Sequence, residues 1–173
     1  MRPTIPRSAF SLIEVVLAVG ITAVAVVVII GLLSGLTRQS VEAEDTQTAL
    51  RLPEAVTVEL KALATQQGFD NLAGSIAVMS AATDEGLLLV AARDGSQLRR
   101  FVTGESPARE QYFLIEVRKF SSASSLAYNS AMAVLPLNIR VSWPYRQRTP
   151  NGLTAVLPLA GRQNVNFNLA INR

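Results

Sequence analysis

The stretch RSAFSLIEVVLAVGITAVAVVVIIGLL, residues 7–33, decides the fold of this chain because it is almost entirely apolar and lies close to Met1. No charged residue occurs from Val15 to Thr37. As a helix this run spans about 35 Å, enough to cross the core of a bilayer. A single carboxylate, Glu14, stands just before the run. A charge in an apolar helix is costly, so Glu14 requires a partner or a position near the membrane surface.

The charges on the two sides of the apolar run predict its orientation. Arg2, Arg7 and the amino terminus precede it, whereas Arg38 and then three acidic residues follow it: Glu42, Glu44 and Asp45. The positive-inside rule places the short N-terminal end in the cytoplasm and the long remainder outside.

Three interpretations of the apolar run compete. A cleaved secretory signal normally has a shorter apolar region, and Leu33–Leu36 is a poor match to an A-x-A-like cleavage site. An uncleaved signal anchor accounts for the length and orientation but leaves Glu14 unexplained. The third interpretation places a cut before the run and keeps the helix.

The segment SAFSLIEVVLA, residues 8–18, resembles the processing site of type IV prepilins and pseudopilins. The resemblance implies a leader from Met1 to Ala9, a cut between Ala9 and Phe10, and N-methylation of Phe10. Ala9 replaces the Gly of most members. In this family a Glu at position five of the mature chain is thought to meet the free amine of a neighbouring subunit, and Glu14 holds that position, four residues after Phe10. The alternative role for Glu14 is that its side chain only reaches the lipid headgroups.

Two departures from major pilins favour a minor pilin or minor pseudopilin. Gly31 stands where major pilins commonly carry a Pro, and the chain has no cysteine pair to close a C-terminal loop. Glu14 itself argues against the tip class of pseudopilins, which typically lacks this residue. A fainter likeness, through FSLIEVVLAVGI and the late Ser142–Trp143–Pro144, is to the Verru_Chthon cassette protein B group of prepilin-like proteins.

Residues 38–67 continue the helical period beyond the membrane. The apolar stripe at helical spacing comprises Val41, Thr48, Ala49, Leu52, Val56, Leu60 and Leu63. Pro53 either kinks one long helix or begins a second one. The acidic cluster Glu42–Glu44–Asp45 is expected to be a solvated face or to pair with arginines of neighbouring subunits, rather than to bind a metal.

Beyond Gly68 the period changes to two, which predicts strands. Residues 87–102 read as a hairpin with Asp94–Gly95 in the turn. Further strands are expected at YFLIEVRKF (112–120), LPLNIRVSW (135–143), LTAVLPL (153–159) and NVNFNLAI (164–171), with the third pairing with the second. Pro136 implies a strand start or a sheet edge.

The predicted fold class is therefore α+β: a long N-terminal helix, membrane-spanning in its first half, packed on an antiparallel sheet of about four to six strands. This is the shape that the pilin resemblance also implies. The expected division is a leader (1–9), a transmembrane and assembly segment (10–37), an extramembrane helix (38–67, possibly broken at Pro53) and a globular sheet domain (68–173).

Composition limits the chemistry. The 173 residues contain no Cys and no His, which excludes Ser-His-Asp and Cys-His nucleophile systems. Asp70–Asn71 and Asp84–Glu85 are better explained as turn residues than as a calcium site. The basic pairs Arg99–Arg100, Arg118–Lys119 and Arg146–Arg148 favour a solvated sheet surface over a nucleic-acid interface, with a net charge of +3. We expect no catalytic residue, cofactor or metal.

The function expected from the resemblance is a non-enzymatic structural subunit of a type IV pilus or type II secretion-like filament. Its implied partners are other pilin or pseudopilin subunits, prepilin peptidase, the inner-membrane assembly platform and membrane lipid, with no nucleic acid. The implied location is a bacterial inner membrane, with the C-terminal domain periplasmic until assembly into a periplasmic or extracellular filament. The alternative is a membrane-anchored binding module, for DNA or a surface ligand, that does not polymerise.

Overall fold

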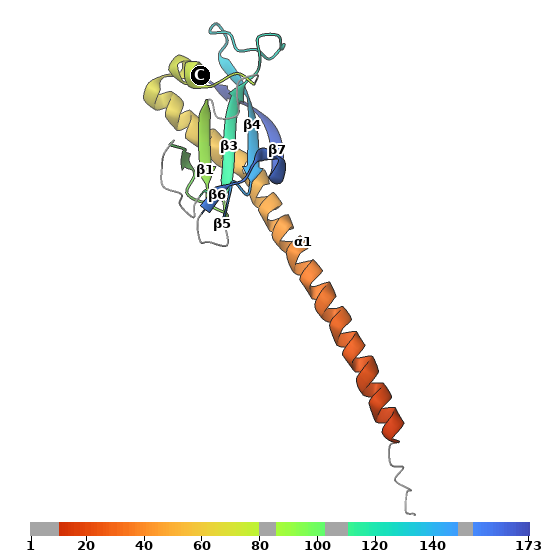
Figure 1. Cartoon of the computed structure of the whole chain (residues 1–173). Helices are drawn as coiled ribbons and strands as arrows, with labels where there is room; N and C mark the ends of the chain where they lie inside the picture. Colours follow the sequence, from red (N-terminus) through yellow and green to blue (C-terminus); the bar gives the residue numbers. More distant parts are fainter. Residues whose placement is uncertain (1–10, 80–85, 103–110, 149–153) are drawn as a thin grey trace, which may run out of the picture. The chain divides into compact units, whose positions relative to one another are not determined.

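A computed structural model describes residues 11–79, 86–102, 111–148 and 154–173. The chain divides into two compact units, Met1–Glu44 and Asp45–Arg173. The described part of the first unit is helical from Leu12 onward. The second contains the rest of that helix and an antiparallel sheet (Figure 1). The α+β class predicted from the sequence is confirmed at this level.

Helix α1 (Leu12–Gln67) runs through Pro53 without interruption. Proline lacks the N–H that would bond to the carbonyl of Ala49, yet the helix continues because tertiary packing holds both sides of this position. Ala49, Leu52, Val56 and Leu60 are all buried, at spacings of three and four residues. Of the two roles considered for Pro53, the start of a second helix is therefore wrong.

Gly68 ends α1 because its backbone adopts φ of +88° and ψ of 144°, a conformation that is open to glycine. A short helix follows, α2 (Phe69–Ser75), with Phe69, Leu72 and Ala73 buried. The expectation that the helical period stops at Gly68 is thus wrong. Asp70 and Asn71 lie in this helix and not in a turn.

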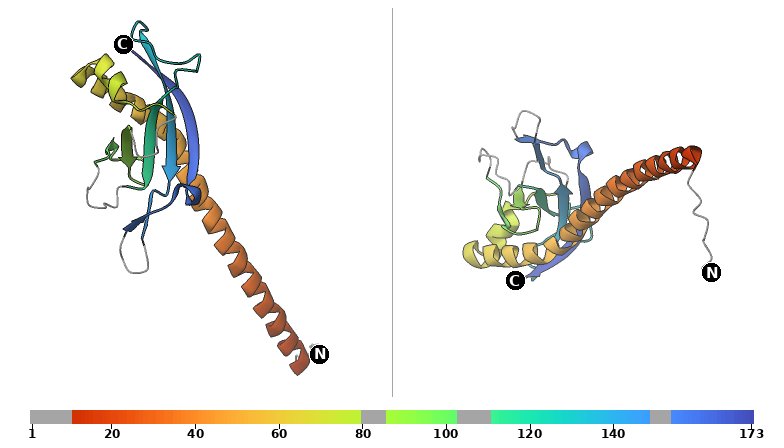
Figure 2. Two further views of the ribbon diagram at one scale, coloured as in Figure 1. Left: turned by 45° about the horizontal axis from the view of Figure 1, so that its top comes forward. Right: turned by 90° about the horizontal axis from the view of Figure 1, so that it is seen from below.

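The sheet has five strands in the order β2-β1-β3-β4-β7, all antiparallel (Figures 1 and 2). Its members are β1 (Leu87–Ala91), β2 (Arg99–Arg100), β3 (Phe113–Lys119), β4 (Val134–Trp143) and β7 (Gln163–Asn172). The predicted hairpin is confirmed: β1 pairs with β2 across a turn in which Gly95 has φ of +79°. Pro136 is the third residue of β4, so the expected strand start is wrong. It lies opposite Ala170 of β7 and beyond the pairing of β4 with β3, which begins at Leu137, so on the β3 side it occupies an unpaired edge position.

One predicted pairing is wrong. The segment 153–159 was expected to pair with β4, but β7 occupies that place along the full length of β4. Strand β6 (Thr154–Val156) instead pairs with β5 (Arg146–Arg148) in a separate two-stranded ribbon, followed by a short 3₁₀ helix, η1 (Leu159–Gly161). The chain leaves the sheet after Trp143, where Tyr145 N–H bonds to the carbonyl of Tyr112.

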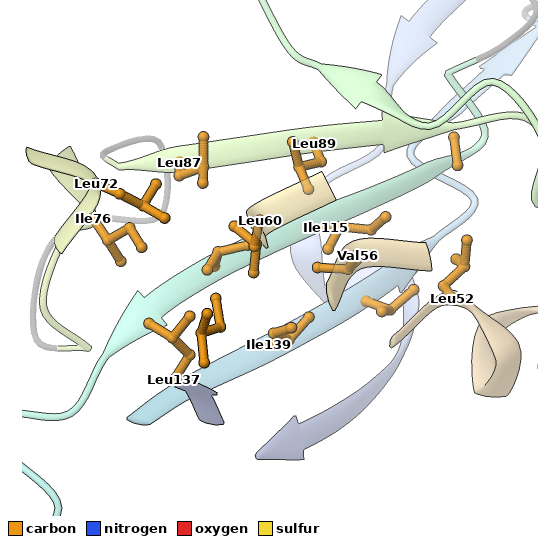
Figure 3. Packing of buried hydrophobic residues seen from close by; sticks show 14 of the residues in the cluster. Leu52, Val56, Leu60, Leu72, Ile76, Leu87, Leu89, Ile115, Leu137 and Ile139 are labelled. Carbon is orange, nitrogen blue, oxygen red and sulfur yellow. The ribbon is translucent and has the colours of Figure 1, made fainter. Parts of the chain in front are cut away.

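The main core lies between α1 and one face of the sheet (Figure 3). Leu52, Val56 and Leu60 from α1 face Ile115 of β3 and Ile139 of β4, all 2 % exposed or less. Each such side chain contributes about 1.5–3 kcal/mol on burial. The predicted covering of the α1 stripe by the sheet is confirmed from Ala49 to Leu60, and Leu63 packs at the margin of the same cluster. Val41, the first residue of the predicted stripe, is exposed.

Candidate functional site: the start of the apolar helix

The first described residues form a hydrogen-bonded cap on α1. Ser11 Oγ accepts the N–H of Ile13 (3.3 Å), and Glu14 Oε2 accepts the N–H of Ser11 (3.0 Å). Ser followed three residues later by Glu is the sequence of a capping box, and Glu14 accepts the Ser11 N–H as that motif requires. The Ser11 side chain accepts the N–H two residues on instead of three, which still satisfies a helix-terminal donor. The carboxylate also lies in the first turn, where the helix dipole favours negative charge. Glu14 therefore has a local role that the expectation from the resemblance does not include.

The signal for this cap was present in the sequence as Ser11-x-x-Glu14, and it was missed. The cap uses one carboxylate oxygen of Glu14 and leaves Oε1 without a hydrogen bond inside the described chain. A carboxylate can accept about four hydrogen bonds, so the cap leaves room for a second partner. Ala9 and Phe10, the predicted cleavage and methylation residues, lie outside the described residues.

The helix beyond Glu14 exposes its apolar surface. Every residue from Leu12 to Glu44 is exposed, and an 18-residue window reaches a mean hydropathy of 3.0 with none of it buried. In length and composition this helix is compatible with a single-pass membrane anchor. Among the described residues of its own unit this segment packs on nothing, so its surface requires cover from lipid or from other helices.

Three hydroxyl side chains within this run bond back to the helix itself. Thr22, Ser34 and Thr37 each donate to the carbonyl four residues earlier, at 2.8, 3.0 and 2.8 Å. They are the only polar side chains between Val15 and Thr37. Their polar groups are therefore satisfied without water, which is what a lipid environment demands.

The acidic cluster that follows the apolar helix is not uniformly solvated. Asp45 is buried, and its carboxylate accepts Arg93 Nε (2.8 Å), Arg93 Nη2 (3.1 Å) and the Tyr112 hydroxyl (2.7 Å). Burial, together with the hydrogen bond to Asp45, raises the pKa of Tyr112 above its usual value of 10.0. The expected solvated face is thus wrong for Asp45, which instead joins α1 to the β1–β2 turn and to the start of β3.

The outer face of the sheet holds a second buried ionic cluster. The Glu116 carboxylate lies 3.3 Å from Arg140 Nη1 and 3.5 Å from Arg118 Nη2, and the residues Glu116 and Arg118 are 2 % and 5 % exposed. Beside Glu116 lies a half-open cavity of about 330 Å³, lined by Leu114, Glu116, Val156, Leu157, Pro158, Leu159 and Arg162. The prediction of a solvated surface is therefore wrong for Arg118.

A third polar group closes the far end of the second unit. The Tyr128 hydroxyl donates to Asp70 Oδ1 (2.8 Å), and Arg173 forms an ion pair with the same carboxylate. The hydrogen bond to Asp70 raises the pKa of Tyr128. This explains Asp70 as a structural group that ties α2 to the chain following β7.

None of these groups brings Glu14 together with another ionisable side chain, and within the described ranges no cluster of three acidic residues converges on one point. The candidate site that combines an unusual charge with an unexplained surface is the start of α1. Comparison with known proteins adds nothing to this assignment, because no family model, no curated protein and no solved structure matches the chain.

Proposed function

We propose that this chain is a non-enzymatic, membrane-anchored subunit of a pilin-like filament, of the minor pilin or minor pseudopilin kind. One observation carries the proposal: an exposed apolar helix about 35 Å long carries a single carboxylate, and that carboxylate lies in its first turn. Lipid alone would be enough to cover the apolar surface, so the surface by itself does not require a neighbouring subunit. A carboxylate at the edge of that surface gains most where a neighbouring subunit brings a positive charge to it.

Processing after Ala9 would create that positive charge. The new amino group would belong to Phe10, next to the capped turn formed by Ser11 and Glu14. Cleavage leaves the Phe10–Ser11 peptide intact, so the Ser11 N–H that Glu14 accepts is retained. The remaining oxygen of Glu14 is then free to meet the amino group of a neighbour.

Substitutions at Glu14 and Ser11 distinguish the role of Glu14 in capping the helix from the role of its charge in assembly. Glu14→Gln keeps a residue that can complete a capping box but removes the charge, whereas Ser11→Ala weakens the cap and keeps the charge. If assembly uses the charge, Glu14→Gln lowers incorporation into filaments sharply and Ser11→Ala does not. Glu14→Asp is expected to be intermediate, because its side chain is one methylene shorter.

The assay is the fraction of tagged chain in sheared or cross-linked complexes, against the fraction left in the membrane as monomer. Equal membrane levels of all variants serve as the control for insertion. If Glu14→Gln enters the complexes as well as the unchanged chain does, while Ser11→Ala fails, then Glu14 acts only as a cap and the proposed assembly role is wrong.

A second candidate is a membrane-anchored binding module that remains monomeric. The cavity beside Glu116, on the face of the sheet opposite α1, favours it because such cavities are common ligand sites. This candidate predicts that cross-linking in the membrane yields monomers only, and that every Glu14 variant behaves alike.

A further inference from the structure

The two edges of the five-stranded sheet differ in how they are protected. The β2 edge is two residues long, and both residues are arginines. The β7 edge is ten residues long and contains neither a proline nor a charged residue. Short strands and charges are the usual means of preventing edge-to-edge pairing, so β2 is protected and β7 is not.

The backbone of β7 is paired on one side only. All ten of its residues are in register with β4, from Gln163 opposite Trp143 to Asn172 opposite Val134. Figure 1 shows β7 beside β4 at the edge of the sheet. Every second residue of such a strand directs its N–H and C=O away from its partner. No backbone hydrogen bond joins residues 163–172 to any described segment other than β4.

The side chains of β7 are also incompletely covered. On the face toward α1, Val165, Phe167 and Leu169 are half-buried, whereas Leu137, Ile139 and Val141 of the adjacent β4 are fully buried. One further strand beyond β7 would complete the burial of this row. On the opposite face the Asn168 side chain accepts a hydrogen bond from Asn138 of β4 (2.8 Å). The asparagine side chains of β7 can therefore form hydrogen bonds with a neighbouring strand.

A pocket marks the path that such a strand would follow. It has a volume of about 400 Å³ and lies between α1 and the end of β7, lined by Lys61, Ala64, Thr65, Phe69, Asn172 and Arg173. Arg173 is paired with Asp70. Lys61 is exposed and has no ion-pair partner among the described residues. The pocket therefore presents one uncompensated positive charge next to an uncharged strand edge.

We propose that the β7 edge binds an extended segment of a partner protein by strand addition. The segment that fits has alternating apolar and uncharged polar side chains along β7, and an acidic side chain where it passes Lys61. Backbone hydrogen bonds to β7 supply affinity, and the apolar row and Lys61 supply specificity. This inference concerns the second unit alone and does not depend on Glu14.

The test uses the full chain in detergent micelles and labelled ten-residue peptides of alternating Val and Thr. One peptide carries Glu at both ends and the other carries Lys at both ends. We expect the Glu peptide to bind about tenfold more tightly than the Lys peptide, as measured by fluorescence anisotropy at low salt. Equal binding of the two peptides, or binding of neither, overturns the proposal.

Charge reversal at the pocket checks the assigned site. Lys61→Glu is expected to invert the preference between the two peptides, and Arg51→Glu, an equal change elsewhere on the exposed side of α1, is expected to leave it unchanged. Because both positions are exposed, neither change should prevent folding. An unchanged preference in Lys61→Glu overturns the proposed site.

N-methylated peptides check the mode of binding. Methyl groups on every second peptide nitrogen block one hydrogen-bonding edge of the peptide and leave the other open. Strand addition requires that one of the two complementary methylated sets loses binding and the other retains it. If both sets bind equally, the peptide is held by side chains alone and strand addition is wrong.

Discussion

Asp45 lies in a different environment in the structure from the one that its neighbours in the sequence suggest. It follows Glu42 and Glu44 and looks like part of a solvated acidic run. Its burial against Arg93 and Tyr112 follows from the position of the β1–β2 turn, which lies far from it in sequence. No local pattern encodes that contact, so the sequence could not predict it.

Removing the carboxylate of Asp45 is expected to destabilise the fold. Asp45→Asn loses the charge that Arg93 faces, and Tyr112→Phe loses only one hydrogen bond to a charged group. We expect Tyr112→Phe to cost about 1.5–3 kcal/mol and Asp45→Asn at least as much. Denaturant unfolding followed by the single tryptophan, Trp143, which is 3 % exposed, measures both.

The matched control is Glu44→Gln, an exposed change one residue away that should alter the free energy of unfolding by about 0.5 kcal/mol or less. If Asp45→Asn behaves like Glu44→Gln, the contacts of Asp45 do not stabilise the fold.

Tyr112 should also report its environment through pH. Because its pKa is raised in the folded chain, its contribution to stability is complete below pH 10 and is lost as the pH rises from there through the folded pKa. The difference in tyrosinate absorbance between the unchanged chain and Tyr112→Phe isolates Tyr112 from Tyr128, whose pKa is also raised, and this difference should appear well above pH 10. If the absorbance that Tyr112→Phe removes titrates near pH 10 instead, the burial and hydrogen bonding of Tyr112 are contradicted.

At the scale of elements, the strands were predictable where their two faces differ. Strand β4 alternates fully buried Leu135, Leu137 and Ile139 with half-buried neighbours, and β7 follows the same period. The partner of β6 was not predictable, because a period of two identifies a strand but not its neighbour. The burial of Glu116 was not predictable either, because its surroundings come from segments distant in sequence: Arg140 lies 3.3 Å from its carboxylate, and Val156 is among the residues that line the adjoining cavity.

Helix α2 was missed although its signal was present. Phe69, Leu72, Ala73 and Ile76 are spaced by three, one and three residues and are all buried, which is the pattern of a helical face. The glycine at its start obscured the pattern, because Gly68 ends one helix and begins the next in a single residue. Local breaks of this kind are read as the end of helical structure when the following helix has only seven residues.

Two glycines give matched tests of these elements. At Gly86, before β1, φ is +108° and an added Cβ would lie 2.7 Å from Cβ of Ala77. Gly86→Ala should therefore destabilise the fold by more than about 1 kcal/mol. At Gly74, in α2, an added Cβ meets nothing within 4 Å. Gly74→Ala should stabilise it by about 0.5–1 kcal/mol. Thermal unfolding compares the two, and the reverse order would contradict the helical conformation of Gly74 or the close approach of Gly86 to Ala77.

At the scale of the whole molecule, the two units differ in whether their apolar side chains are exposed or buried. The described part of the first unit exposes its apolar side chains, and the second unit buries Leu52, Val56 and Leu60 in its own core. A truncated chain comprising residues 45–173 should therefore be soluble without detergent and unfold in one cooperative transition, because its apolar helix face is covered by the sheet. Aggregation, or loss of Trp143 signal without a cooperative transition, would contradict this packing.

Whether residues 1–9 are removed distinguishes the three interpretations of the apolar run. We expect cleavage between Ala9 and Phe10, followed by addition of one methyl group to the new amino terminus, as the prepilin resemblance implies. The cap on α1 begins at Ser11, so the helix start survives this cut unchanged. Intact mass of the membrane-extracted chain measures the outcome, with Glu14→Gln as a companion variant because processing should not require the charge. A chain that retains Met1 would identify an uncleaved anchor. One that begins beyond residue 33 would identify a secretory signal, and either result would remove the amino group that Glu14 is proposed to meet.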